Sequence, residues 1–237
     1  MNTYSCRIRP VLLPKNGKER GNNMSDKVIE TNIVTIVGTI YSALVFSHEM
    51  FGEGFYNFEL KVHRLSEQSD ILPVTISERL LVGVNMDMNN NIKIEGQLRS
   101  YNKYVDGSNK LVLTIFARDI SPCDNEEEIN NPNQIYLDGF ICKRPIYRTT
   151  PFGREITDVL LAVNRPYNKS DYIPCIAWGR NARFSEKLTV GDRIKVWGRV
   201  QSRDYQKKIS DEKTISKTAF EVSVSKMENY ENNIKEL

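Results

Sequence analysis

Basic and aromatic side chains occupy five of the six alternate positions from residue 195 to residue 205, and Gln201 occupies the sixth. The five are Lys195, Trp197, Arg199, Arg203 and Tyr205. A period of two predicts a β-strand that carries these side chains on one face and apolar ones on the other. Single-stranded nucleic acid offers charged phosphates and unpaired bases, so its binders combine cations with flat aromatic rings. The pattern therefore indicates a nucleic-acid surface. An edge strand with a basic exposed face is the alternative.

The same alternation appears in the strand expected over residues 172–178. Tyr172 and Trp178 fall on one face, and Ile173 and Cys175 fall on the other. A short helix over residues 181–188 separates the two strands, with Phe184 and Leu188 spaced i, i+4 so that both face the core.

Composition excludes several classes of protein. With 237 residues, of which 40% are hydrophobic, the chain can bury one large core or two ordinary ones. No apolar run approaches the roughly 20 residues of a membrane-spanning helix, and the N-terminus lacks a signal-peptide core. The four cysteines form no CxxC pair and there are only two histidines, so we expect no disulfide, metal or cofactor. We therefore expect a cytoplasmic protein.

Charge is distributed unevenly. Residues 32–120 carry 8 Lys+Arg against 10 Asp+Glu, whereas residues 133–229 carry 18 against 11. A polyanion-binding surface is therefore expected mainly on the second half.

The chain repeats itself. Residues 32–120 predict five strands, at 33–42, 55–64, 71–77, 92–101 and 110–120, with a short helical piece near 79–84. Residues 121–132, SPCDNEEEINNP, form an acidic linker. Landmarks then recur at one offset: 101 residues separate Gly38 from Gly139, Arg64 from Arg165 and Pro73 from Pro174, and 102 separate Gly96 from Gly198. We interpret the chain as a duplicated domain in which each copy has its own core.

Five short strands with a helix after the third is the order of an OB-fold, a Greek-key barrel that binds oligonucleotides. The predicted fold class is therefore all-β, with two tandem five-stranded OB-fold barrels at residues 32–120 and 133–229. Residues 1–31 are expected to be disordered and 230–237 to form a short tail. Met24 follows Lys18–Asn23, which a purine-rich ribosome-binding run could encode, so Met24 is a second candidate for the true start.

The second copy resembles the bacterial single-stranded DNA-binding protein family. The segments LDGFICKRPIYRTTPFGREITDVLLAVNR, YIPCIAWGRNARF and GDRIKVWGRVQSRDY occur in the order that is typical of that family. The resemblance extends over residues 133–227. It implies a non-enzymatic protein that coats and protects single-stranded DNA in replication, repair or recombination. It also implies a bacterial protein that is associated with the nucleoid.

The resemblance implies specific binding residues. The stacking aromatics fall on Tyr172, Trp178 and Tyr205, on the same side as Trp197. The implied phosphate or base contacts are Arg148, Arg165, Arg180, Arg199, Arg203, Lys207 and Lys208. A structural ion pair is the alternative for Arg165, and a solvated helix face is the alternative for Arg180 and Arg183.

The first copy lacks much of this chemistry. Ser77, Ile71 and Glu95 stand where the second copy has Trp178, Tyr172 and Trp197. Tyr101 and Tyr104 could supply one platform. We expect weak polyanion binding there, or a barrel kept for pairing and for docking partners.

Family members usually present four barrels, so a homodimer is expected, with a monomer as the alternative. They also end in an acidic, Phe-terminated tip that recruits other proteins, whereas this chain ends in ENNIKEL, which suggests an accessory paralogue with fewer replication or repair partners. Two other classes remain: a duplicated barrel used for protein assembly, and an enzyme such as a nuclease, which the lack of clustered carboxylates disfavours. Single-stranded RNA is an alternative ligand, because stacking does not distinguish the sugars.

Overall fold

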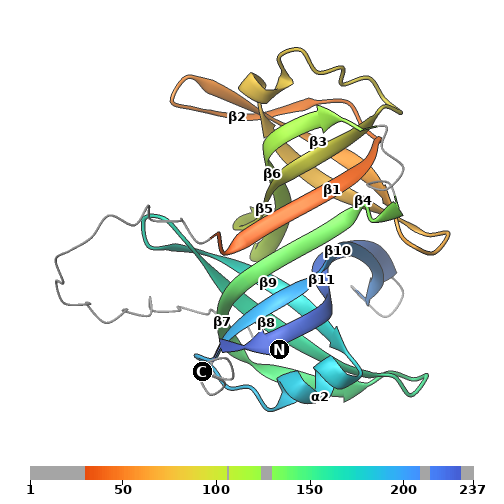
Figure 1. The fold of residues 1–237 in the computed structure, drawn as a ribbon, viewed down its shortest axis with the longest axis vertical. Coiled ribbons are helices and arrows are strands. Elements are labelled where there is room, and N and C mark those ends of the chain that lie inside the picture. Colours follow the sequence, from red (N-terminus) through yellow and green to blue (C-terminus); the bar gives the residue numbers. More distant parts are fainter. Residues whose placement is uncertain (1–29, 106, 124–129, 209–213, 231–237) are drawn as a thin grey trace.

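The computed structural model describes residues 30–105, 107–123, 130–208 and 214–230. Expectations for residues 1–29, for residues 124–129 of the linker and for 231–237 lie outside these ranges. Two β-barrels are stacked along the long axis of the molecule (Figure 1). The first contains β1 (Asn32–Ile40), β2 (Val45–Met50), β3 (Glu53–His63), β4 (Ser69–Ser77), the 3₁₀ helix η1 (Glu78–Leu81), β5 (Asn91–Val105) and β6 (Ser108–Pro122). The second contains β7 (Asn133–Thr149), β8 (Glu155–Arg165), β9 (Lys169–Trp178), α2 (Arg180–Glu186), β10 (Arg193–Lys208) and β11 (Thr214–Asn229).

Each barrel has the predicted OB-type strand order. In the second barrel β7 pairs with β8 and β10, β8 pairs with β9, and β10 pairs with β11. A short parallel contact between β9 and β11 closes the barrel. The first barrel repeats this pattern, with β4 and β6 as the parallel pair. The predicted fold class, all-β with two tandem OB-fold barrels, is confirmed.

The prediction of five strands in the first copy is wrong. Its first strand is split into β1 and β2, because the chain leaves the ladder between residues 41 and 44, where the Ser42 hydroxyl accepts a 2.9 Å hydrogen bond from the Glu59 amide. In the second copy the equivalent strand, β7, is continuous over 17 residues and bends by register shifts on either side of Lys143. Bulges and a break are two ways to bend a strand around a small barrel.

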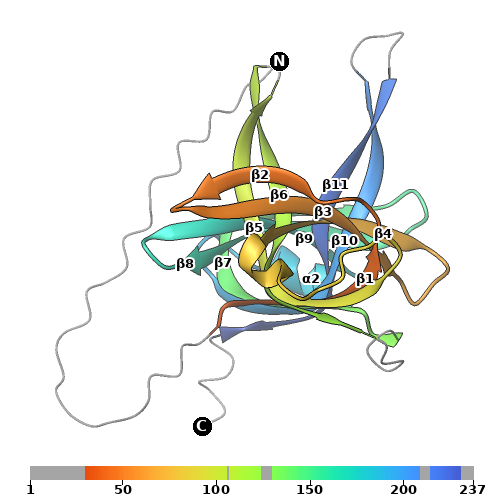
Figure 2. The same cartoon turned by 90° about the horizontal axis from the view of Figure 1, so that it is seen from above.

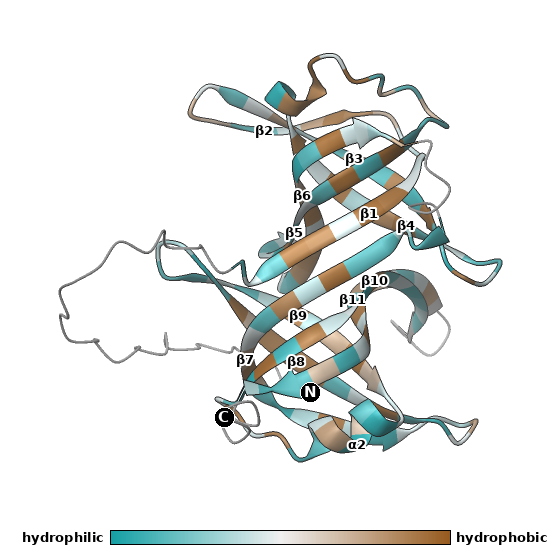
Figure 3. Cartoon of the chain, viewed as in Figure 1, coloured by the Kyte–Doolittle hydropathy of each residue, from teal (hydrophilic) through white to brown (hydrophobic). Residues whose placement is uncertain are grey.

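Helix α2 is shorter than the predicted 181–188, but it faces the core as predicted. Leu188 is buried, and Phe184 packs on the core. Alternating apolar and polar bands follow the strands (Figure 3). The apolar interiors of the two barrels form one connected cluster rather than two separate cores.

The repeated glycines lie where strands approach closely. A Cβ atom at Gly96 would lie 2.2 Å from the Phe116 carbonyl oxygen, and one at Gly198 would lie 2.2 Å from the Ser223 carbonyl oxygen. Both positions adjoin a register shift. Glycine therefore recurs at the same place in both copies, because neighbouring strands there leave no room for a side chain.

The barrels are joined by antiparallel pairing of β1 with β7, which lie side by side where the barrels meet (Figure 1). The register places Val34 opposite Ile135, and these two positions are equivalent in the repeat, 101 residues apart. The pairing is therefore centred on a local pseudo-twofold axis. Each first-strand edge is covered by the other barrel, which removes an exposed edge from both.

Two buried aspartates reinforce this joint. Asp70 of the first barrel accepts a 2.7 Å hydrogen bond from the Ser202 amide of the second. Asp171 of the second barrel accepts a 2.7 Å hydrogen bond from the Ser100 amide of the first. Ser202 lies within β10 and Ser100 within β5, and the hairpins β10–β11 and β5–β6 project from the same side of the molecule (Figure 2).

Candidate nucleic-acid interface

A row of side chains runs along the outer face of β9 and is called here the β9 row: Tyr172, Pro174, Ile176 and Trp178. The alternate residues Ile173, Cys175 and Ala177 lie in the core, so the row faces outward. Tyr172 is half-buried and Trp178 is 37% exposed. The structure therefore brings two of the predicted aromatics onto one strand face, at its two ends.

The row has an apolar floor. Ile176 and its neighbour Ile156 on β8 are buried, although neither belongs to the barrel core. Ile156 is the direct register partner of Trp178. Ile156 and Ile176 therefore flank Trp178 on the outer face with buried apolar surface.

Arg148 lies on the same face, across β8 from Trp178, because Arg148 pairs with Ile156 and Ile156 pairs with Trp178. Its guanidinium donates hydrogen bonds to Asp158 at 2.8 and 3.1 Å. The hydrogen bonds to Asp158 raise the pKa of Arg148 above its ordinary value. The cation is oriented by this exposed carboxylate.

A second group lies where the β10–β11 hairpin leaves the barrel. The Arg203 guanidinium is 3.3 Å from a Glu221 oxygen and 6.0 Å from the ring centroid of Tyr205. Tyr205 is 38% exposed. Lys207 and Lys208 continue the backbone of β10, but their side chains lie outside the described part. Arg180 is exposed at the start of α2, two residues after Trp178.

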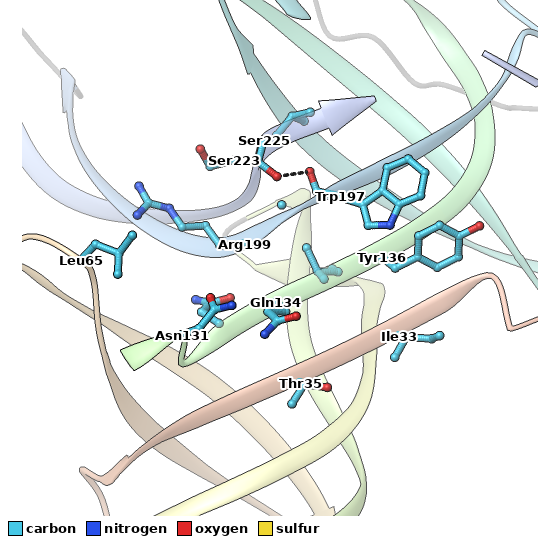
Figure 4. Close-up of a pocket in the computed structure, with 14 residues that line it drawn as sticks. Ile33, Thr35, Leu65, Asn131, Gln134, Tyr136, Trp197, Arg199, Ser223 and Ser225 are labelled. Atoms are coloured by element: carbon cyan, nitrogen blue, oxygen red, sulfur yellow. Dashed lines mark hydrogen bonds between the residues drawn. The ribbon is translucent and has the colours of Figure 1, made fainter. Parts of the chain in front are cut away.

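Trp197 and Arg199 lie in a shallow groove of about 590 Å³ between β1, β7, β10 and β11. Trp197 packs against Tyr136, with ring centroids 5.3 Å apart, and the Lys226 ammonium is 4.7 Å from the indole. Figure 4 shows these two rings at one end of the groove and Arg199 with Leu65 at the other. Tyr172, Trp178 and Tyr205 do not line it.

Sequence reasoning missed Tyr136 and Lys226. Both residues are cross-strand partners of Trp197: Tyr136 pairs with it from β7 and Lys226 pairs with it from β11. Only the strand register could have indicated them. Burial raises the pKa of the Tyr136 phenol.

Arg165 lies in the joint, where its guanidinium nitrogen Nε is 3.1 Å from the buried carboxylate of Asp171. The ion-pair alternative fits this position, because Asp171 has no exposed surface and needs a counter-charge. Arg165 is therefore left out of the interface that is proposed below.

The equivalent face of the first barrel is built differently. Ser77 is buried and bonded to Glu53, and the aromatic stands on the neighbouring strand as Phe55, which is stacked on His48 at 4.9 Å. Tyr101 and Tyr104 are 48% and 72% exposed on the β5–β6 hairpin.

Within the described ranges, no three His, Cys, Asp or Glu side chains cluster as a metal site requires. No helix in those ranges is long and apolar enough to cross a membrane.

The second barrel is similar to a known protein family. The model of the single-strand binding protein family matches residues 132–230. "Single-stranded DNA-binding protein 1" of Staphylococcus aureus is 37% identical over 81 residues, which are 31% of this chain and 48% of the relative. "Single-stranded DNA-binding protein A" of Bacillus subtilis is 35% identical over 81 residues, 31% of this chain and 47% of the relative. The chain thus spans about half the length of the curated relatives that it matches.

The two-barrel fold also has a counterpart. The single-stranded DNA binding protein from Thermus aquaticus superposes with a TM-score of 0.65 at 20% identity, covering 84% of this chain and 92% of that one. At this identity the likeness concerns the fold alone. The family match spans the whole of the second barrel, so residues 132–230 are similar to the single-strand binding protein family.

Proposed function

We propose that the chain binds single-stranded DNA, mainly through its second barrel. The β9 row carries this proposal: an exposed indole and a half-buried phenol stand on one strand face, over an apolar floor, with Arg148 beside them. Unpaired bases stack on such rings, and each stack contributes about 1–3 kcal/mol. The names of the matched relatives agree with this ligand.

Phosphates are contacted by cations around the row. Arg148, Arg180 and Arg203 are exposed on or beside this face. Arg148 and Arg203 each hold a carboxylate that a phosphate can replace. Lys207 and Lys208 extend the positive charge along the hairpin. Trp197 and Arg199, in the groove one strand beyond β11, offer a further platform and cation.

The bound DNA strand undergoes no chemical change. The role of the protein is to protect this DNA and to keep it unpaired. The processes that expose such strands are replication, repair and recombination, and the nucleoid is where they occur.

A fluorescence titration tests this function. Long oligo-dT is added to the full chain at low and moderate salt while the two tryptophans are followed. We expect quenching and an affinity that falls as salt rises, because phosphate neutralisation releases counterions. Absence of quenching and binding at low salt would refute the function. Oligo-U at the same salt compares RNA with DNA.

A homodimer with four barrels is the proposed assembly. The first-strand edges of both barrels are already paired with each other, so the second copy must associate through another surface. Light scattering behind size exclusion measures the mass directly, and a monomer at micromolar concentration would contradict the assembly.

Docking of a protein partner on the first barrel is the second candidate function. Strand β2 is an edge strand, and all six of its residues are exposed, including Val45 at 64% and Phe46 at 59%. Edge strands with apolar side chains pair readily with other chains. Val45→Asp is then expected to leave DNA affinity unchanged, and a clear loss of DNA affinity would contradict a docking role.

A further inference from the structure

Two phenylalanines stand fully exposed at equivalent turns of the two barrels. Phe51, between β2 and β3, is 101% exposed, and Phe152, between β7 and β8, is 91% exposed. They are 101 residues apart, and each is followed by a glycine with a φ of +75°. Figure 1 shows the two turns at opposite ends of the molecule. The two copies differ at the β9 row, yet both retain this Phe-Gly turn.

The turn that carries Phe152 is rigid. Gly153 donates its amide to the Thr150 carbonyl at 2.9 Å, and Thr150 donates its amide to the Arg154 carbonyl at 2.8 Å. The Thr150 hydroxyl also accepts the Arg154 amide at 3.0 Å. The ring is therefore presented to solvent by a fixed backbone, which lowers the entropy cost of binding.

The turn adjoins the end of the β9 row. Arg148 is opposite Ile156, which is opposite Trp178, and the Thr149–Glu155 pair is the next rung toward the turn. The Gly179 amide, next to Trp178, donates to the Glu155 carbonyl at 3.0 Å. Single-stranded DNA that has a base stacked on Trp178 and that continues along this face would thus reach Phe152.

The surrounding charge differs in sign between the two turns. Arg154 follows Phe152 by two residues, is exposed, and forms no ion pair among the residues that the structure describes. The equivalent position after Phe51 is Glu53. Glu53 is paired with Arg79, but Glu49 precedes Phe51 by two residues and the Glu78 carboxylate lies beside Gly54, so the turn is acidic. Phosphate is attracted to the turn at Phe152 and repelled by the turn at Phe51.

We propose that Phe152 is a further stacking platform for an unpaired base, with Arg154 contacting the adjacent phosphate, and that Phe51 has no such role. The binding face of the second barrel then runs from Tyr172 at the joint through Trp178 to the β7–β8 turn. This proposal rests on the proposed function and lengthens its site.

Matched substitutions test it. Phe152→Ala in the full chain is expected to weaken oligo-dT binding by about fivefold or more, and Phe51→Ala is expected to leave it unchanged. Both rings are exposed, so the thermal midpoint should not move in either variant. Equal affinity of Phe152→Ala and the wild type would overturn the proposal, as would equal losses in both variants.

A reporter distinguishes stacking from indirect effects. In a Trp178→Phe, Trp197→Phe background, Phe152→Trp places the only indole at the turn, and Phe51→Trp gives the matched control. We expect oligo-dT to quench the first indole and not the second. If wild type binds and Trp178→Ala weakens it while the Phe152→Trp indole stays unquenched, this inference fails and the proposed function stands. If wild type does not bind, the proposed function itself fails.

Discussion

Asp171 in the second barrel and Ser100 in the first form a hydrogen-bonded pair across the joint, with 2.7 Å between the carboxylate oxygen and the Ser100 amide. The Ser100 hydroxyl accepts in turn from the Tyr172 amide, also at 2.7 Å. The first residue of the β9 row is thereby fixed by the other barrel. The degenerate first barrel contributes to the proposed binding face by positioning it.

The two joint aspartates should respond oppositely to pH. Burial raises the pKa of Asp70, but hydrogen bonds from Arg64 and Ser202 outweigh it, so the pKa lies below its ordinary value. Burial dominates at Asp171 and holds its pKa above that value. Asp70 therefore adds stability above about pH 4 that is lost as pH falls. Asp171 adds stability in acid that is lost as pH rises through its folded pKa.

We accordingly expect Asp70→Asn to cost more unfolding free energy at pH 7 than Asp171→Asn. The Asp70→Asn cost should shrink on acidification below about pH 4. Urea unfolding at several pH values measures both. Equal costs at pH 7 would contradict the assigned directions.

Gly198→Ala should destabilise the second barrel. Its Cβ atom would lie 2.2 Å from the Ser223 carbonyl oxygen, which belongs to the backbone and cannot rotate away. We expect a loss of about 2 kcal/mol or more in unfolding free energy. The exposed Ser216→Ala is the control and should change it by less than about 0.5 kcal/mol. An unchanged thermal midpoint in Gly198→Ala would contradict the close approach.

Substitution of Arg203 should reduce DNA affinity, whereas substitution of Arg165 should reduce stability. Arg203→Ala is expected to weaken oligo-dT binding and to lower the salt slope by about 0.7, the value of one phosphate contact on a single strand. Arg165→Ala leaves buried Asp171 with less counter-charge and should lower stability by about 3 kcal/mol. The reverse pattern, with the salt slope changed only by Arg165→Ala, would contradict the assignment of Arg165 to the joint.

Trp178→Ala should weaken oligo-dT binding by about 1–3 kcal/mol, because one stacking platform is removed. Adding Tyr205→Ala should weaken it further while the thermal midpoint is retained, since both side chains are partly exposed. The affinity titration and a thermal melt check the two statements. Unchanged affinity in the double variant would show that the strand lies elsewhere.

The duplication could be predicted from the sequence because glycines recur at the same offset wherever strands approach closely. The strands could be predicted because their apolar and polar residues alternate. The alternation also placed Tyr172 and Trp178 on one face. The joint was hidden, since Val34 and Ile135 look like ordinary core residues and Asp171 looks like a surface charge. A structural ion pair was foreseen as the alternative for Arg165, but the burial of its partner Asp171 depends on the joint and could not be predicted. Phe152 was missed because a single apolar residue in a loop carries no period, and its exposure depends on the folded turn.

Whether DNA lies on the β9 row is tested by titrating the Trp197→Phe variant, in which Trp178 is the only indole, with oligo-dT at low salt. We expect strong quenching that is reversed by added salt. Binding without any quenching of Trp178 would contradict it, because the strand would then lie away from the β9 row.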